Sequence, residues 1–107
     1  MTATVSPNVG VIYDGLNKSN LKGAYSLDEA YAVKNVLNFI ANVLSKGEKG
    51  KSISISGKPF NTLDCMAEII LPFLNKGASI GTFTLAEASK INTAFVELTA
   101  EVKKFEE

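Results

Sequence analysis

The chain has 107 residues, 46% of them hydrophobic and 21% charged, with a formal net charge of zero, which predicts a single soluble globular domain over residues 1–107. His, Trp, Arg and Gln are absent, so His-dependent catalysis, most zinc sites and arginine-based recognition of phosphate or guanine are excluded. The neutral, Arg-free composition predicts no nucleic-acid partner, and no run of eighteen apolar residues is present to cross a membrane.

The cellular location is predicted from cysteine usage and the first residues. A single Cys, Cys65, excludes an intramolecular disulfide and fits a reducing compartment. Residues 1–7 have neither the basic region nor the apolar core of a signal peptide. We therefore expect a cytoplasmic protein. The abundance of Lys, Asn and Ile without Arg also fits a phage-encoded protein, so a virion component is the alternative.

The first 24 residues favour an irregular N-terminal arm followed by a polar loop. Pro7 could open a helix with Val9 and Ile12 on one face, since Pro is favoured at the first helical position. Gly10 and Gly15 weaken that interpretation, because glycine costs about 1 kcal/mol in a helix interior. We expect an arm with apolar anchors, and a helix is the alternative.

The first predicted helix covers about residues 26–46. Ser26 and Glu29 form a capping box at its start, and Gly47 ends it. Its apolar arc spans about 200°, wider than the stripe that a three-helix domain usually buries. The rest of the helix carries mostly amide side chains. These predict either a solvated face or a strip that hydrogen-bonds a neighbouring chain.

Two short extended segments follow from period-two patterning. Residues 52–56 alternate Ser and Ile and predict a half-buried strand. Residues 79–83 predict a second short strand. We expect the two segments to pair with each other.

The second predicted helix covers about residues 62–76 and holds the most apolar dozen residues of the chain, 63–74. Asn61 or Thr62 caps it. Its only polar strip carries Asp64 and Glu68. Pro72 lies inside it and predicts a kink or a break nearby.

The third predicted helix covers about residues 84–105. Thr84 and Glu87 form a second capping box. The apolar positions that follow are spaced four and three residues apart, which indicates a single narrow buried stripe: Ile91, Phe95, Leu98, Val102 and Phe105.

One internal similarity connects two of these helix starts. Residues 23–30 (GAYSLDEA) and 81–88 (GTFTLAEA) match in residue or residue type at seven of eight positions, and residues 57–64 are a looser copy. Capping chemistry alone favours such strings at helix starts. An ancient duplication of a helical hairpin is the alternative interpretation.

Three candidate chemical motifs are weak. Residues 45–52 resemble a phosphate-binding P-loop, but they begin with Ser45 in place of Gly and follow a helix instead of preceding one, so we expect a solvated loop and no cofactor. Cys65 has no His or Arg to activate it and is expected to be buried. Asp64 and Glu68 are four residues apart, but without a third ligand they predict a solvent edge rather than a metal site.

The sequence therefore predicts a mainly α, three-helix domain with a minor strand pair, residues 25–107 forming the core. Because two of its helices need more cover than the chain supplies, we expect a non-enzymatic structural or interaction protein. It would self-associate or dock on a larger assembly through a protein–protein surface on those helices: Asn35, Asn38, Phe39, Asn42, Ile69, Ile70 and Phe73. The alternative is a small-molecule-binding or enzymatic domain in which Asp64 and Glu68 converge with Lys49, Lys51 or Lys58.

Overall fold

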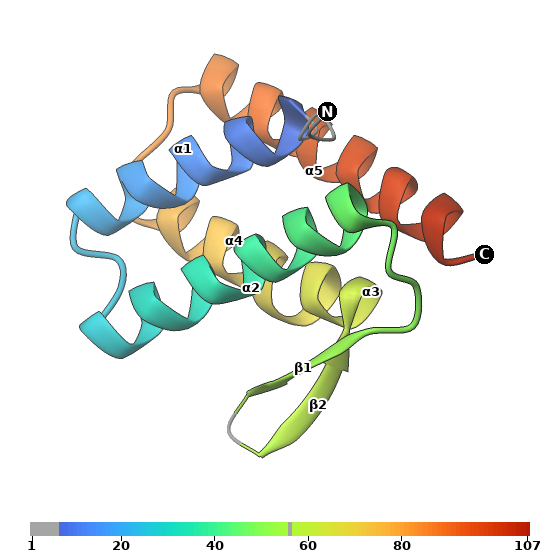
Figure 1. Ribbon diagram of the computed structural model, residues 1–107. Helices are drawn as coiled ribbons and strands as arrows, with labels where there is room; N and C mark the ends of the chain where they lie inside the picture. The colour runs from blue at the N-terminus through green and yellow to red at the C-terminus, as the bar shows by residue number, and fades with distance from the viewer. Residues whose placement is uncertain (1–6, 56) are drawn as a thin grey trace.

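The computed structural model describes residues 7–55 and 57–107, and it confirms a mainly α fold with one small antiparallel sheet (Figure 1). The elements in chain order are α1 (Pro7–Leu21), α2 (Leu27–Lys46), β1 (Ser52–Ile55), β2 (Lys58–Asn61), α3 (Thr62–Cys65), η1 (Met66–Ile70), α4 (Leu71–Ser79) and α5 (Leu85–Glu106). α3, η1 and α4 follow one another without a break, and we call them together the middle helix.

The predicted irregular arm is wrong for residues 7–21, which form α1; residues 1–6 lie outside the described part of the chain. Val9 and Ile12 are buried, as the helical alternative required. α1 packs against α4 and α5, and this tertiary packing outweighs the glycine cost. Gly15 is itself buried, and a Cβ there would lie 2.9 Å from Cδ1 of Ile91, so the glycine permits close approach to α5.

The predicted pairing of residues 52–56 with 79–83 is also wrong. β1 pairs with β2 in a local hairpin, in which Ser52 faces Asn61 and Ile55 faces Lys58. Gly57, at φ 81°, supplies the left-handed residue at its turn, and Ser56 lies outside the described residues. A neighbouring partner closes a far shorter loop, which costs less entropy than pairing with residues 79–83. Those residues instead complete the end of α4 and the turn into α5.

The middle helix changes its hydrogen bonding just before Pro72, where the sequence predicted a kink or a break. Met66–Ile70 is π-helical, and the Leu71 N–H donates to the Met66 carbonyl, five residues back. Pro72 has no N–H to donate, and its ring crowds the preceding turn, so the irregularity lies where proline disfavours regular α geometry. Asn61 caps the start of the helix, where its side chain accepts from the Asp64 N–H.

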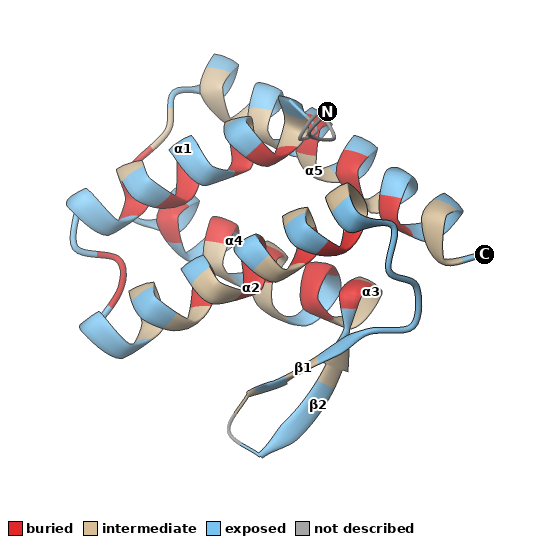
Figure 2. Ribbon diagram, viewed as in Figure 1, coloured by how far each residue is buried: buried red, intermediate tan, exposed pale blue. Residues whose placement is uncertain are grey.

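The core lies between the helices, and the β-hairpin extends away from them (Figure 2). α1 covers apolar surface that the three predicted helices alone would leave exposed, because its buried face packs against the middle helix and α5. The largest fully buried side chains come from every long helix: Ile12, Leu37, Ile40, Met66, Ile70 and Leu98.

The fold contains two similar helix–turn–helix units, with equivalent residues 58 positions apart. We call α1 and α2 the N-terminal pair, and the middle helix with α5 the C-terminal pair. Both predicted capping boxes are present, Ser26 with Glu29 and Thr84 with Glu87. The two caps have nearly identical backbone angles, φ −73° and ψ 170° against φ −71° and ψ 166°.

The turns that precede the two caps are also equivalent. In the first turn, the Gly23 N–H donates to the Asn20 carbonyl at 3.0 Å and the Ala24 N–H donates to the Ser19 carbonyl at 3.1 Å. In the second turn, the Gly81 N–H donates to the Ala78 carbonyl at 3.1 Å and the Thr82 N–H donates to the Gly77 carbonyl at 3.3 Å. Gly23 and Gly81 both have positive φ, 87° and 77°. Capping chemistry alone does not require this repeated bonding upstream of the cap, so the resemblance extends through the whole turn.

Two ion pairs connect the units reciprocally. Lys18 of α1 pairs with Glu87 of α5, and Lys76 of α4 pairs with Glu29 of α2 at 3.0 Å. Lys18 and Lys76 are equivalent positions, and so are Glu29 and Glu87. Each unit thus contributes the lysine of one ion pair and the glutamate of the other. Reciprocal contacts of this kind are typical of an interface with two-fold symmetry. The two helix pairs are therefore arranged about an approximate two-fold axis within one chain.

α1 and α4 approach each other tightly at two equivalent positions, Ser19 and Gly77. Ser19 is fully buried and donates a 2.9 Å hydrogen bond to the Gly15 carbonyl. A Cβ on Gly77 would lie 1.9 Å from the Ser19 Oγ and 2.6 Å from its Cβ. A residue that meets its own equivalent lies on the axis, and here serine fits only because glycine faces it.

Candidate functional site

Two surface grooves lie at equivalent places, one inside each helix pair. The first, between α1 and α2, has a volume of about 130 Å³, and the second, between α4 and α5, about 210 Å³. All nine residues of the first groove have their equivalents in the second: Tyr13 with Leu71, Leu16 with Leu74, Asn17 with Asn75, Asn20 with Ala78, Tyr25 with Phe83, Ala30 with Ala88, Val33 with Ile91, Lys34 with Asn92, and Leu37 with Phe95.

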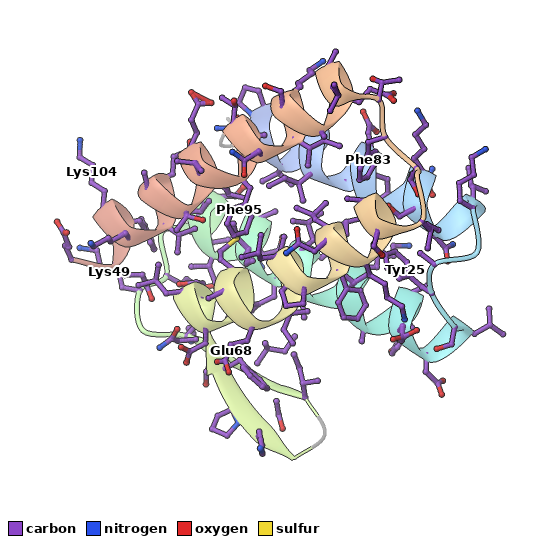
Figure 3. The ribbon with its side chains drawn as sticks, turned by 180° about the vertical axis from the view of Figure 1, so that it is seen from behind. Tyr25, Lys49, Glu68, Phe83, Phe95 and Lys104 are labelled. Carbon is purple, nitrogen blue, oxygen red and sulfur yellow. The ribbon has the colours of Figure 1, made fainter. Side chains whose placement is uncertain are left out.

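The two grooves differ in polarity. The first carries Tyr13, Tyr25 and Lys34, whereas the equivalent residues in the second are Leu71, Phe83 and the uncharged Asn92. Figure 3 shows Phe95 between α4 and α5. Burial raises the pKa of Tyr25, whose hydroxyl donates to the Phe73 carbonyl at 2.6 Å. The groove lined by apolar side chains in the C-terminal pair therefore has a more polar counterpart in the N-terminal pair.

Besides the two grooves, a hollow of about 170 Å³ lies between α1 and α5, and it is not equivalent to either groove. Its apolar wall comes from Val11, Gly15, Phe83 and Ile91. Its charged residues are two acids and two lysines: Asp14, Glu87, Lys18 and Lys90. A hollow of this kind can hold an uncharged group of a few carbon atoms.

Several exposed apolar side chains lie close in the sequence to the two helix turns. The two leucines directly after the caps are almost fully exposed, Leu27 at 91% and Leu85 at 92%. Leu21, Tyr31 and Ile80 are at least half exposed nearby in the sequence. Both turns lie at the same end of the molecule, where the reciprocal ion pairs hold them (Figure 1). We call this region the turn end.

The side chains predicted for a protein–protein surface lie in several environments. Asn38 and Asn42 are exposed on α2, while Asn35, Phe39 and Ile69 are partly buried. The two others face inward or pack against this chain. Ile70 has no exposed surface, and Phe73 packs its ring against Tyr25, with the centroids 5.1 Å apart. Ile70 therefore has no surface to offer a partner in this fold.

Among the described residues, no ion pair joins Asp64 or Glu68 to the lysines of the enzymatic alternative, Lys49, Lys51 and Lys58. Glu68 is exposed, and Figure 3 shows it well apart from Lys49. Lys49 instead donates to the backbone carbonyl of Glu107 and lies over the Phe105 ring, 5.9 Å from its centroid. Within residues 7–55 and 57–107, no group of three metal-ligating side chains is present.

The loop at 45–52 interacts with a carboxylate of this chain. The Gly50 N–H donates to Oε1 of Glu106 at 3.3 Å, and Thr62 donates to the other oxygen at 3.2 Å. The amide that a P-loop would direct at phosphate thus contacts a side chain of α5. The segment joins α2 to β1, which is the reverse of the strand-to-helix order of a P-loop.

Cys65 is buried with no exposed surface, which confirms the sequence prediction. Burial, together with the nearby negative charges of Asp64 and Glu68, raises the pKa of its thiol to about 11. The thiol therefore stays protonated near neutral pH, and a protonated thiol is a poor nucleophile.

The grooves and the hollow were not predicted from the sequence. One signal was available, the match between residues 23–30 and 81–88. The match also extends toward the N-terminus at the same spacing of 58 residues, where Ile12, Leu16 and Lys18 are identical to three residues of the second unit: Ile70, Leu74 and Lys76. Upstream identities of this kind fall outside the capping motif and would have favoured the duplication.

Comparisons with protein families, with curated proteins and with solved structures found no match for this chain. Among the described residues, no helix has the length and apolar character needed to cross a membrane.

Proposed function

We propose that this chain is a non-catalytic interaction protein that docks a second copy or another protein on its turn end. The observation that carries the proposal is the exposure of Leu27 and Leu85 at equivalent positions on the two helix pairs. Single exposed leucines are ordinary, but apolar side chains grouped at one end of a molecule are typical of interaction surfaces.

The packing of the turn end supports docking on a preformed surface. The two turns are held by the ion pairs Lys18–Glu87 and Lys76–Glu29 and by four backbone hydrogen bonds of the same pattern. A surface already fixed before docking costs less entropy to bind than one that must order. The strip on α2 that includes Asn38 and Asn42 stays a second predicted surface for the same function.

The test is sedimentation of the purified chain, together with mass measurement of the native complex from its source. Wild-type protein should sediment as a dimer or larger at micromolar concentrations, or should be found with a partner in the native complex. Leu27→Asp with Leu85→Asp should weaken either association by at least tenfold, because charge at an apolar interface must be desolvated. Asp in a first helical turn is favoured by the helix dipole, so this variant should keep its fold.

A matched variant separates the two surfaces. Asn38→Lys with Asn42→Lys changes two exposed residues on α2, away from the turns. It should leave association unchanged. Loss of association in this variant alone would place docking on α2, and a monomer without a partner in the native complex would contradict the proposed function.

A further inference from the structure

The hollow between α1 and α5 corresponds to a place that the other half of the molecule fills with a phenyl ring. Gly15 of its wall is equivalent to Phe73, and Phe83 is equivalent to Tyr25. In the other half, the Phe73 ring packs against the Tyr25 ring with centroids 5.1 Å apart and an interplanar angle of 37°. Next to Gly15 no such ring exists, and Phe83 lines an open hollow.

Neighbouring side chains fill only part of this space. A Cβ on Gly15 would lie 2.9 Å from Cδ1 of Ile91, and the equivalent of Ile91 is the smaller Val33. The extra methyl group thus reaches toward the glycine. About 170 Å³ remains beside it, partly open to solvent. For scale, an enclosed apolar cavity of about 150 Å³ takes up benzene.

The charges around the hollow favour an uncharged occupant. Lys18 is already paired with Glu87, and the remaining two charges, on Asp14 and Lys90, are opposite in sign. A ligand with a net charge would gain from one of these and be repelled by the other. A neutral ring would replace water on the apolar wall without separating the existing ion pair.

We propose that this hollow binds one neutral aromatic ring, supplied by a phenylalanine side chain of a protein partner. The binding of the ring stands on the equivalence of the two halves, and only its origin in a partner rests on the proposed function. The bound ring would pack against Phe83 as Phe73 packs against Tyr25.

The test is an NMR titration of the full chain with N-acetyl-phenylalanine amide, which carries the ring on a neutral peptide unit. The amide signals of Gly15, Lys90 and Ile91 should shift and saturate in the millimolar range, as a single small ring provides limited affinity. Nuclear Overhauser contacts should join the ring protons to the Ile91 δ-methyl group. N-acetyl-alanine amide should shift none of these signals.

A filled variant is the matched control. Gly15→Phe with Ile91→Val reproduces the Phe73 and Val33 of the other half and should lower affinity for the probe at least about tenfold. Gly10→Phe, on the same helix but with nothing within 4 Å of its Cβ, should leave binding unchanged. If the filled variant does not fold, the contacts to Ile91 in the wild-type chain decide the matter.

Three results would overturn the proposal. Absence of saturable shifts and of contacts to Ile91 would contradict ring binding, as would equal binding to the folded filled variant. Saturable binding of benzyl alcohol without binding of the peptide probe would contradict a protein side chain as the source. Because the titration uses the isolated chain, the two proposals can fail separately. Ring binding by a chain that has no partner would contradict the proposed function and the origin of the ring in a partner, but not ring binding itself. A partner without ring binding would contradict this inference alone.

Discussion

The two helix pairs have the same turn and differently filled interiors. Each has a left-handed glycine, a capping box and an exposed leucine at equivalent places. A lysine of each pair also forms an ion pair with the capping glutamate of the other pair. They differ where the side chains point inward, at Gly15 against Phe73, Ser19 against Gly77 and Ala24 against Thr82. The backbone of the turn is thus the repeated feature, while the packing behind it is particular to each half.

The axis itself explains one of these differences. Two identical side chains that meet on a two-fold axis must each fit against a copy of themselves. Serine at both positions would collide, because a Cβ on residue 77 already lies 1.9 Å from Oγ of Ser19. A single chain can place serine on one side and glycine on the other, which two identical subunits cannot do. The predictions below test how far the two halves are equivalent.

The largest expected effect is at Gly77. Gly77→Ala should lower the free energy of unfolding by about 3 kcal/mol, because its Cβ would overlap the Ser19 side chain in a packed interior. Gly10→Ala is the matched control: nothing lies within 4 Å of its Cβ, and it should raise stability by about 1 kcal/mol through helix propensity. Urea denaturation measures both values. A Gly77→Ala variant as stable as wild type would contradict the close approach of α1 and α4.

The next effect is at Thr82, the equivalent of Ala24. Its hydroxyl is buried without a hydrogen-bond partner among the described residues, which costs free energy. Thr82→Val keeps the shape and removes the hydroxyl, so it should raise the free energy of unfolding by about 1 kcal/mol. Thr62→Val is the matched control, since the buried Thr62 donates to Glu106, and it should lower stability by about the same amount. A loss of stability in Thr82→Val would show that its hydroxyl has a partner.

The smallest effect is the acid dependence of the two capping glutamates. The backbone N–H of Ser26 and then Lys76 lower the pKa of Glu29, and Lys18 and then the backbone N–H of Thr84 lower the pKa of Glu87. A lowered folded-state pKa gives stability that is present above the unfolded value of about 4.5 and is lost as pH falls through the folded value. Wild-type Tm should therefore fall between about pH 6 and about pH 3.

Substitution shows whether the two caps contribute equally. Glu29→Gln and Glu87→Gln should each reduce this acid-induced fall in Tm, and by similar amounts. Glu97→Gln, at an exposed site on α5, should leave the fall unchanged. A large difference between the two cap variants would show that the halves are equivalent in geometry but not in energetics.

Local chemistry predicted part of this fold from the sequence. The capping boxes at Ser26 and Thr84 identified the starts of α2 and α5, and Pro72 marked the irregular part of the middle helix, because caps and prolines act within one helical turn. α1 was missed because Gly10 and Gly15 were counted as helix breakers, whereas tertiary contacts decide their conformation. The grooves and the hollow depend on how the two pairs pack, which no single segment specifies.

The central claim, that residues 19 and 77 are equivalent positions facing each other across an internal two-fold axis, is tested most directly by exchanging them. Gly77→Ser alone should destabilise the chain by about 3 kcal/mol, since two serines would overlap. The exchange variant, Ser19→Gly with Gly77→Ser, should recover most of that loss, because one serine again faces one glycine. Urea denaturation of the wild type, both single variants and the exchange gives the coupling energy. An exchange variant no more stable than Gly77→Ser would contradict the two-fold arrangement.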